Sequence, residues 1–183
     1  MLEWSFGRFR LRFTFSFFAL VGLAASLGSN VQPMMVQIIV CSLLHELGHI
    51  FAMCLFGICP GALTFCAGGI RLSEECLACR KWKRAFILLA GCAVNLSLSA
   101  AGVVFGLGDE FSAVNLILGI FNLLPFRYFD GGRLYSELTG REPPFLLRAA
   151  ALLPLAAAAA LSVAEGELPV PLIAAMAIML ADG

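Results

Sequence analysis

Charged side chains are scarce in this sequence: Asp, Glu, Lys and Arg make up 13% of the 183 residues, whereas 61% are hydrophobic. A soluble domain usually has about a quarter charged residues, so this deficit argues against an ordinary soluble domain and indicates a membrane protein with several spans. An excess of either sign is also missing, because twelve Lys plus Arg balance twelve Asp plus Glu. The zero net charge argues against a nucleic-acid-binding protein, and no nucleic-acid partner is expected.

The sequence also lacks internal repeats and a disulfide pattern. Its seven cysteines are an odd number and lie in apolar and basic segments alike, unlike the framework of a small disulfide-rich domain. Cys76 and Cys79 form a single C-x-x-C, which we interpret as two loop thiols in preference to half of a metal or redox site. No soluble regulatory domain is recognisable, so we expect one polytopic membrane domain over residues 1–183.

Long apolar stretches dominate what is present. A bilayer-spanning helix needs about 20 mostly apolar residues, because the hydrocarbon core is about 30 Å thick. Six stretches meet or approach this length, which predicts an all-α membrane protein with about six transmembrane helices. They cover residues 13–27, 33–56, 85–107, 113–126, 145–164 and 171–181. Residues 57–71 alternate in polarity and contain several glycines, which predicts a short re-entrant hairpin or loop between helices 2 and 3. An amphipathic loop lying on the membrane is the alternative.

The basic residues indicate an orientation. All twelve Lys and Arg lie in the N-terminal arm, residues 57–84 and residues 127–148. By the positive-inside rule these segments face the cytoplasm, which predicts a multi-pass protein of the cytoplasmic membrane with a cytoplasmic N-terminus. Arg8, Arg10 and Arg12 ahead of an apolar run also fit a cleavable signal peptide. We favour an uncleaved first helix, because a multi-span chain needs no removable leader.

Histidine is rare, and its placement predicts a metal site. The chain has two histidines, and both belong to His45-Glu46-Leu47-Gly48-His49, an H-E-x-x-H motif within the second apolar stretch. Helical positions four apart share a face, so His45 and His49 can bind one zinc ion while Glu46 acts as general base. An ionisable residue at the centre of a membrane helix costs about 2.5 to 3.5 kcal/mol on insertion scales. A purely structural helical bundle therefore does not explain Glu46, and we expect one Zn²⁺ per chain.

A third ligand is needed, because catalytic zinc sites usually have three protein ligands. Without a third histidine it must be a carboxylate or a thiolate, and Asp130 is the best candidate. Pro125 interrupts the fourth apolar stretch, and Gly131 and Gly132 allow the sharp turn that could bring a ligand beside a membrane site. The alternative is a turn aspartate that caps a helix over residues 133–139.

These motifs together resemble the site-2 protease family of intramembrane zinc metalloproteases, over about residues 13–133. Besides the H-E-x-x-H motif, the resemblance rests on Asn122-x-x-Pro125-x-x-x-x-Asp130-Gly131. It also rests on Gly91-Cys92-Ala93-Val94-Asn95, which is similar to the family's G-P-x-x-N element with cysteine in place of proline.

The resemblance implies a role for each motif. His45, His49 and Asp130 are then the zinc ligands, and Glu46 is the catalytic acid and base. Further candidates, expected to hold substrate or stabilise the oxyanion, are Asn95, Asn122, Gly68 and Gly69.

The implied activity is hydrolysis of peptide bonds in membrane-embedded or membrane-associated proteins, with the active site toward the cytoplasmic side. The layout is most similar to the sporulation branch that processes a sigma factor, so regulated intramembrane proteolysis of a sigma factor or anti-sigma factor is the expected role. Expected partners are a protein substrate, the lipid bilayer, and a regulatory membrane partner or a second copy of the chain. The alternative is a non-catalytic, metal-binding membrane transporter or adaptor, whose ligands would normally be spread over several helices.

Overall fold

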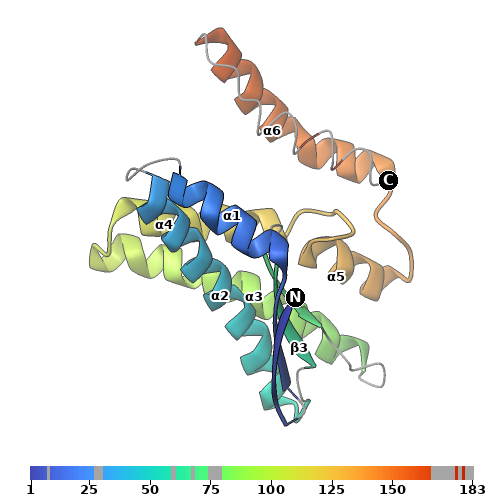
Figure 1. The fold of residues 1–183 in the computed structure, drawn as a ribbon. Coiled ribbons are helices and arrows are strands. Elements are labelled where there is room, and N and C mark those ends of the chain that lie inside the picture. Colours follow the sequence, from blue (N-terminus) through green and yellow to red (C-terminus); the bar gives the residue numbers. More distant parts are fainter. Residues whose placement is uncertain are drawn as a thin grey trace. The chain divides into compact units, whose positions relative to one another are not determined.

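The computed structural model describes residues 1–7, 9–26, 31–58, 61–66, 69–73, 80–165, 176 and 179. The chain forms two compact units, Met1–Phe121 and Asn122–Gly183. The elements of the first unit, in chain order, are β1 (Leu2–Phe6), β2 (Phe9–Phe13), α1 (Phe15–Ser26), α2 (Val31–Leu55), β3 (Ala62–Cys66), β4 (Gly69–Ser73), α3 (Lys81–Phe105) and α4 (Asp109–Asn122), which ends at the boundary (Figure 1). The second unit contains α5 (Asp130–Thr139) and α6 (Phe145–Ala164).

The fold is mostly helical, as expected, but it is not all-α, because the first unit contains a four-stranded sheet in the order β1-β2-β3-β4. β3 and β4 pair antiparallel, so the predicted hairpin is present, although its second strand extends to Ser73, beyond the expected 57–71. Its entry into the bilayer stays a prediction. The two N-terminal strands were not expected: β1 pairs antiparallel with β2, and β2 pairs parallel with β3.

The N-terminal strands follow from a period-two pattern in their sequence. Phe9, Leu11 and Phe13 alternate with Arg10 and Arg12, which is the pattern of a strand with one apolar face. The Phe13 ring stacks on the ring of Phe65 in β3, with centroids 4.5 Å apart. An ion pair of 2.9 Å between the guanidinium of Arg12 and the carboxylate of Glu3 joins β2 to β1. The N-terminal arm and the segment between α2 and α3 are therefore one structural layer.

Three of the described helices are long and apolar enough to cross a bilayer, as expected of a membrane protein: residues Gln32–Leu55 of α2, Lys81–Phe105 and Phe145–Ala164. α1 and α4 have 12 and 14 residues, which correspond to only about 18 and 21 Å of helix. The α4 helix ends at Asn122, ahead of Pro125, whose ring disfavours helical geometry in the residue before it. Six spans stay a prediction, because most of the expected sixth segment, residues 171–181, lies outside the described residues.

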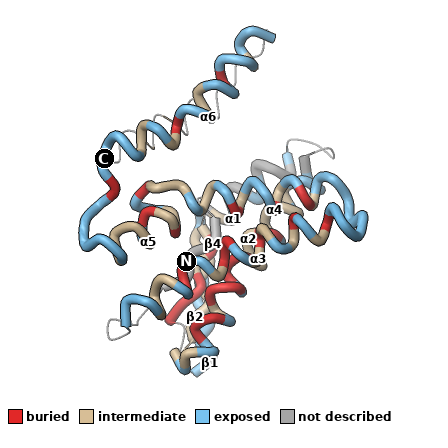
Figure 2. The backbone as a smooth tube through the Cα atoms, turned by 180° about the vertical axis from the view of Figure 1, so that it is seen from behind, coloured by how far each residue is buried: buried red, intermediate tan, exposed pale blue. Residues whose placement is uncertain are grey.

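The helices α2 and α3 pack backbone against backbone. A Cβ atom at Gly48 would lie 2.9 Å from the carbonyl oxygen of Ala90 and 3.1 Å from the Cα of Gly91, so only glycine permits this approach, as is common between membrane helices. Below this contact, Met53 and Ile87 form a buried apolar cluster. In Figure 2 many of the buried stretches lie on these two helices, and β3 is largely buried as well, whereas most of α6 is exposed. Such an apolar yet exposed helix suits a lipid environment.

Candidate metal centre

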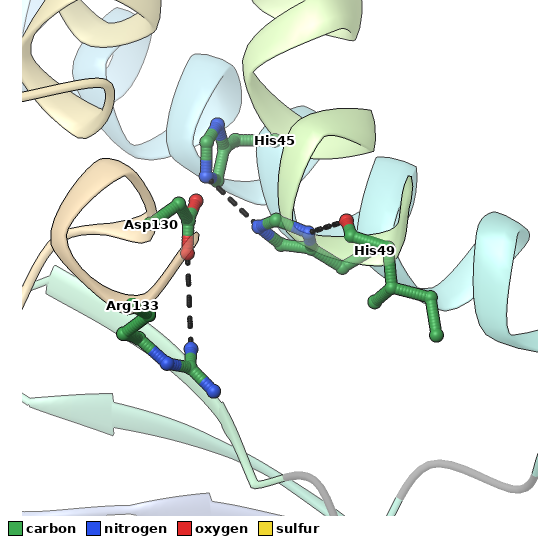
Figure 3. Close-up of polar contacts among 5 residues, drawn as sticks. His45, His49, Asp130 and Arg133 are labelled. Carbon is green, nitrogen blue, oxygen red and sulfur yellow. Dashed lines mark hydrogen bonds and ion pairs between the residues drawn. The ribbon is translucent and has the colours of Figure 1, made fainter. Parts of the chain in front are cut away.

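The two histidines form a compact pair on α2. Both are buried, and their four-residue spacing puts them on the same helical face. Their Nε2 atoms lie 3.1 Å apart, with the two rings nearly perpendicular at 84° (Figure 3). The expected convergence of His45 and His49 on one point is therefore present within the first unit.

Hydrogen bonds at the far side of each ring determine which nitrogen faces that point. His49 Nδ1 lies 2.7 Å from the carbonyl oxygen of Ile87, and His45 Nδ1 lies 3.1 Å from Asn95 Oδ1. Both oxygens can only accept, so each Nδ1 carries the proton, and each Nε2 of a neutral ring presents a lone pair. Metal-binding histidines usually donate their second ring N–H in this way.

The pair of lone pairs fits a metal ion. If both rings are neutral with their protons on Nδ1, two lone pairs face each other at 3.1 Å and repel unless a cation lies between them. Two nitrogens bound to one tetrahedral zinc ion, with Zn–N bonds of about 2.0 to 2.1 Å, would be about 3.3 Å apart. The observed separation of 3.1 Å is therefore close to the one expected for two imidazole ligands of a single zinc ion.

Helix α3 covers the imidazoles through Gly91. A Cβ atom at this position would lie 2.5 Å from His49 Nε2 and 2.8 Å from His45 Cε1, so no side chain fits. Sequence reasoning had assigned Gly91 to a motif without a physical role, because the approach of α3 to α2 is not visible in the sequence. The next residue, Cys92, is buried, and its Sγ lies within 4.8 Å of a ring nitrogen of His45.

Asn95 was expected to contact substrate or an oxyanion, which stays a prediction; within the protein its amide contacts three neighbours. Its side chain is fully buried, at 0% exposure. Asn95 Oδ1 accepts from His45, while Asn95 Nδ2 donates to Asn115 Oδ1 at 3.3 Å and to the carbonyl oxygen of Cys41 at 3.5 Å. Asn115, which the sequence analysis did not identify, also donates to Cys41 Sγ at 3.2 Å.

The remaining candidates in the first unit are only partly described. Glu46 follows His45 on α2 and is buried, and its role as general base stays a prediction. Gly69 opens β4 and pairs with Cys66 of β3. Gly68 lies outside the described residues, as does the C-x-x-C of residues 76–79.

Asp130 belongs to the second unit, where it is buried and opens α5. Its carboxylate lies 3.7 Å from Nη1 of Arg133 one turn later, a pair that Figure 3 also draws. The helix begins three residues earlier than the expected 133–139, and its N-cap is Phe129, so the capping role considered for Asp130 is wrong. Ligation of a metal by Asp130 stays a prediction.

The Gly131-Gly132 pair lets the chain fold tightly around the start of α5. A Cβ atom at Gly131 would collide with the carbonyl of Leu123, and one at Gly132 with the carbonyl of Phe126. Close contact with the preceding loop therefore requires glycine at both positions. Asn122, the last residue of α4, is half-buried at the other end of this loop, and its role in substrate binding stays a prediction.

Comparisons with known proteins agree with this fold. Neither a family model nor a curated protein matches the sequence. Among solved structures, the chain is similar to the Site-2 Protease from Methanocaldococcus jannaschii, with a TM-score of 0.68 and 17% identity over 99% of this chain and 92% of that one. The chain therefore has the fold of a site-2 protease, as its motifs led us to expect. Its assignment to the sporulation branch stays a prediction.

Proposed function

We propose that this protein is a zinc-dependent intramembrane endopeptidase of the site-2 protease family, with His45 and His49 as two of its metal ligands. One observation supports this most directly: two buried Nε2 atoms lie 3.1 Å apart on a highly apolar helix, each with its proton held on the opposite ring nitrogen. The fold similarity to a solved site-2 protease adds independent support.

Asp130 is our proposed third ligand, for one zinc ion per chain. Its carboxylate is buried, and a buried charge is costly unless it is paired or coordinates a metal. The Arg133 guanidinium lies 3.7 Å from this carboxylate and is partly exposed. A carboxylate joining two imidazoles is a ligand set used by zinc peptidases.

The chemistry then divides between the metal and the side chains. Zinc, when bound, polarises the scissile carbonyl and lowers the pKa of water toward neutrality. Glu46, adjacent to His45 and buried, accepts a proton from the attacking water and delivers it to the leaving amine. Asn122 is proposed to hold the substrate carbonyl, whereas the amide of Asn95 serves to orient His45. No covalent intermediate is needed.

We further propose that the protein spans the cytoplasmic membrane about six times, with its N-terminus and active site toward the cytoplasm. The sheet supports the sidedness, because it joins two of the three segments that contain the basic residues. β4 is an edge strand of that sheet, and an extended substrate could pair with it as an added strand. Membrane-associated sigma factors and anti-sigma factors are the first substrates to test.

The test uses the full-length chain in liposomes together with candidate single-span or membrane-associated substrates. Wild type should release a defined fragment, a zinc chelator should stop cleavage, and added zinc should restore it. Glu46→Gln should retain zinc and release no fragment, while Glu110→Gln, at an exposed position in the first turn of α4, serves as the matched control. Cleavage by the Glu46→Gln variant, or cleavage by wild type that withstands zinc removal, would contradict the proposal. Bound zinc without cleavage of any substrate would favour a metal-binding transporter or adaptor.

A further inference from the structure

We infer that Asn115 is a positioning residue for the metal centre: it fixes the orientation of the Asn95 amide and thereby keeps the His45 Nε2 lone pair directed at the metal. This inference rests on the proposed function. Asn115 lies on α4, Asn95 on α3 and His45 on α2, so the chain of contacts runs through three helices of one compact unit.

The first contact determines how the Asn115 amide is oriented. Its Nδ2 lies 2.9 Å from the carbonyl oxygen of Phe111, one turn earlier on α4, and 3.2 Å from Cys41 Sγ. A carbonyl oxygen can only accept, so the NH₂ group of Asn115 must face it. The Oδ1 atom of Asn115 therefore points the other way, toward Asn95.

The second contact passes this orientation on. Asn115 Oδ1 is 3.3 Å from Asn95 Nδ2 and can only accept, so Asn95 must turn its NH₂ group toward Asn115. The carbonyl oxygen of Cys41 favours the same orientation, but at 3.5 Å that bond is at the limit of hydrogen-bonding distance. Asn115 is thus the nearer of the two acceptors that hold the Asn95 amide in place.

The third contact sets the tautomer of His45. With its NH₂ group turned to Asn115, Asn95 presents Oδ1 to His45 Nδ1 at 3.1 Å, and this nitrogen must carry the proton. If the Asn95 amide were reversed, its NH₂ group would need Nδ1 as an acceptor. The proton of a neutral ring would then move to Nε2, which could no longer bind a metal ion.

Burial explains why solvent does not replace Asn115. The side chains of Asn95 and Asn115 are both fully buried, at 0% exposure, so reversing either amide would bring like groups together without water to separate them. Gly119, one turn beyond Asn115, permits the close packing: a Cβ atom there would lie 3.0 Å from the Leu96 side chain and 3.4 Å from Asn95 Cβ. Helix α4 is therefore held against α3 next to Asn95.

The test combines two substitutions in the full-length protein. Asn115→Leu removes the acceptor that orients Asn95, and we expect zinc affinity to fall about 10- to 100-fold, as for other residues that orient metal ligands. Asn95→Asp presents an oxygen to His45 in either orientation, so Asn115→Leu should cost little more in that background. The double variant also shows whether leucine is tolerated at position 115, and Asn115→Ala provides a smaller replacement.

Zinc competition titrations measure the affinities, with Ser112→Ala as the matched control. Ser112 is buried on the same helix, and its hydroxyl donates to the carbonyl of Gly108. Equal losses in both Asn95 backgrounds would mean that Asn115 acts by packing alone, and unchanged affinity in Asn115→Leu would likewise overturn the inference.

Nitrogen-15 NMR of labelled histidine gives a readout that does not require zinc or activity. Since the chain has two histidines, the nitrogen that carries the proton can be identified for each ring in the metal-free protein. We expect the proton of His45 on Nδ1 in wild type and partly on Nε2 in Asn115→Leu. An Nδ1 proton unchanged by the substitution would refute the inference, whereas a wild type that binds no zinc would refute the proposed function and leave this comparison valid.

Discussion

Replacing Gly91 with alanine is the most direct physical test of the metal centre, because the added atom meets both imidazoles. The new Cβ would lie 2.5 Å from His49 Nε2, whereas an ordinary van der Waals contact begins at 3.4 Å. The ring must therefore move by about 0.9 Å, the difference between these two distances. Metal–ligand distances tolerate deviations of only about 0.2 Å, so the variant cannot keep the histidine pair in its binding geometry.

The expected loss of zinc affinity is at least about 100-fold, because loss of a group that merely orients a ligand already costs about 10- to 100-fold and here a ligand ring itself is displaced. That factor corresponds to about 2.7 kcal/mol of binding free energy. The affinity is measured by competition with a zinc-binding dye, and circular dichroism monitors whether the helices form. Alanine is favoured over glycine within a helix by about 1 kcal/mol, so local helix formation is not expected to suffer.

Gly102→Ala is the matched control, because it makes the same chemical change on the same helix. A Cβ atom at Gly102 would overlap the hydroxyl of Ser112 instead of a histidine. Any general cost of crowding α3 should appear in both variants, whereas loss of zinc should appear only in Gly91→Ala. Wild-type zinc affinity in Gly91→Ala, or equal losses in the two variants, would refute the geometry described for the imidazole pair.

Three further predictions concern the reacting groups and the second unit. Glu46→Gln should lower the rate of peptide hydrolysis by about 100- to 10,000-fold, the usual contribution of a general base, and elemental analysis should find the zinc content unchanged. A parallel loss of zinc would make Glu46 a metal ligand and not the general base. Asp130→Ala should lower zinc affinity by at least about 100-fold, the upper range for outer-shell residues. The control Asp109→Ala, in the exposed first turn of α4, should match wild type, and equal affinities in the two variants would remove Asp130 from the ligand set. Gly131→Ala should destabilise the protein by about 1 to 3 kcal/mol, because its Cβ collides with the carbonyl of Leu123; an unchanged thermal denaturation midpoint would contradict that close contact.

The metal-binding pair could be predicted from the sequence because its geometry is local. His45 and His49 are four residues apart in an apolar stretch, and helical spacing alone puts them on one face. The boundaries of the apolar helices were similarly accessible: the stretch 145–164 coincides with α6, and 33–56 differs from α2 by one or two residues at either end.

Features that depend on contacts between distant segments could not be predicted in the same way. The role of Asn95 toward His45 requires the approach of α3 to α2, and that of Asn115 requires α4 as well. The strand β2 is a different case, because the alternation of Phe9, Leu11 and Phe13 with arginines was visible. Those arginines were interpreted as a signal of membrane orientation or of a signal peptide, and their period-two pattern was not used.

The parallel pairing of β2 with β3 constrains how the polypeptide threads the bilayer. Arg10 lies opposite Ala62 and Phe13 opposite Phe65, so residues 13 and 65 are neighbours in the sheet and lie on the same side of any bilayer that the chain crosses between them. Whatever path α1 and α2 take between them, the chain must return to the leaflet from which it departed. The number of complete crossings in that interval is therefore even, and reporter groups placed at the two ends should be accessible from one compartment and protected from the other.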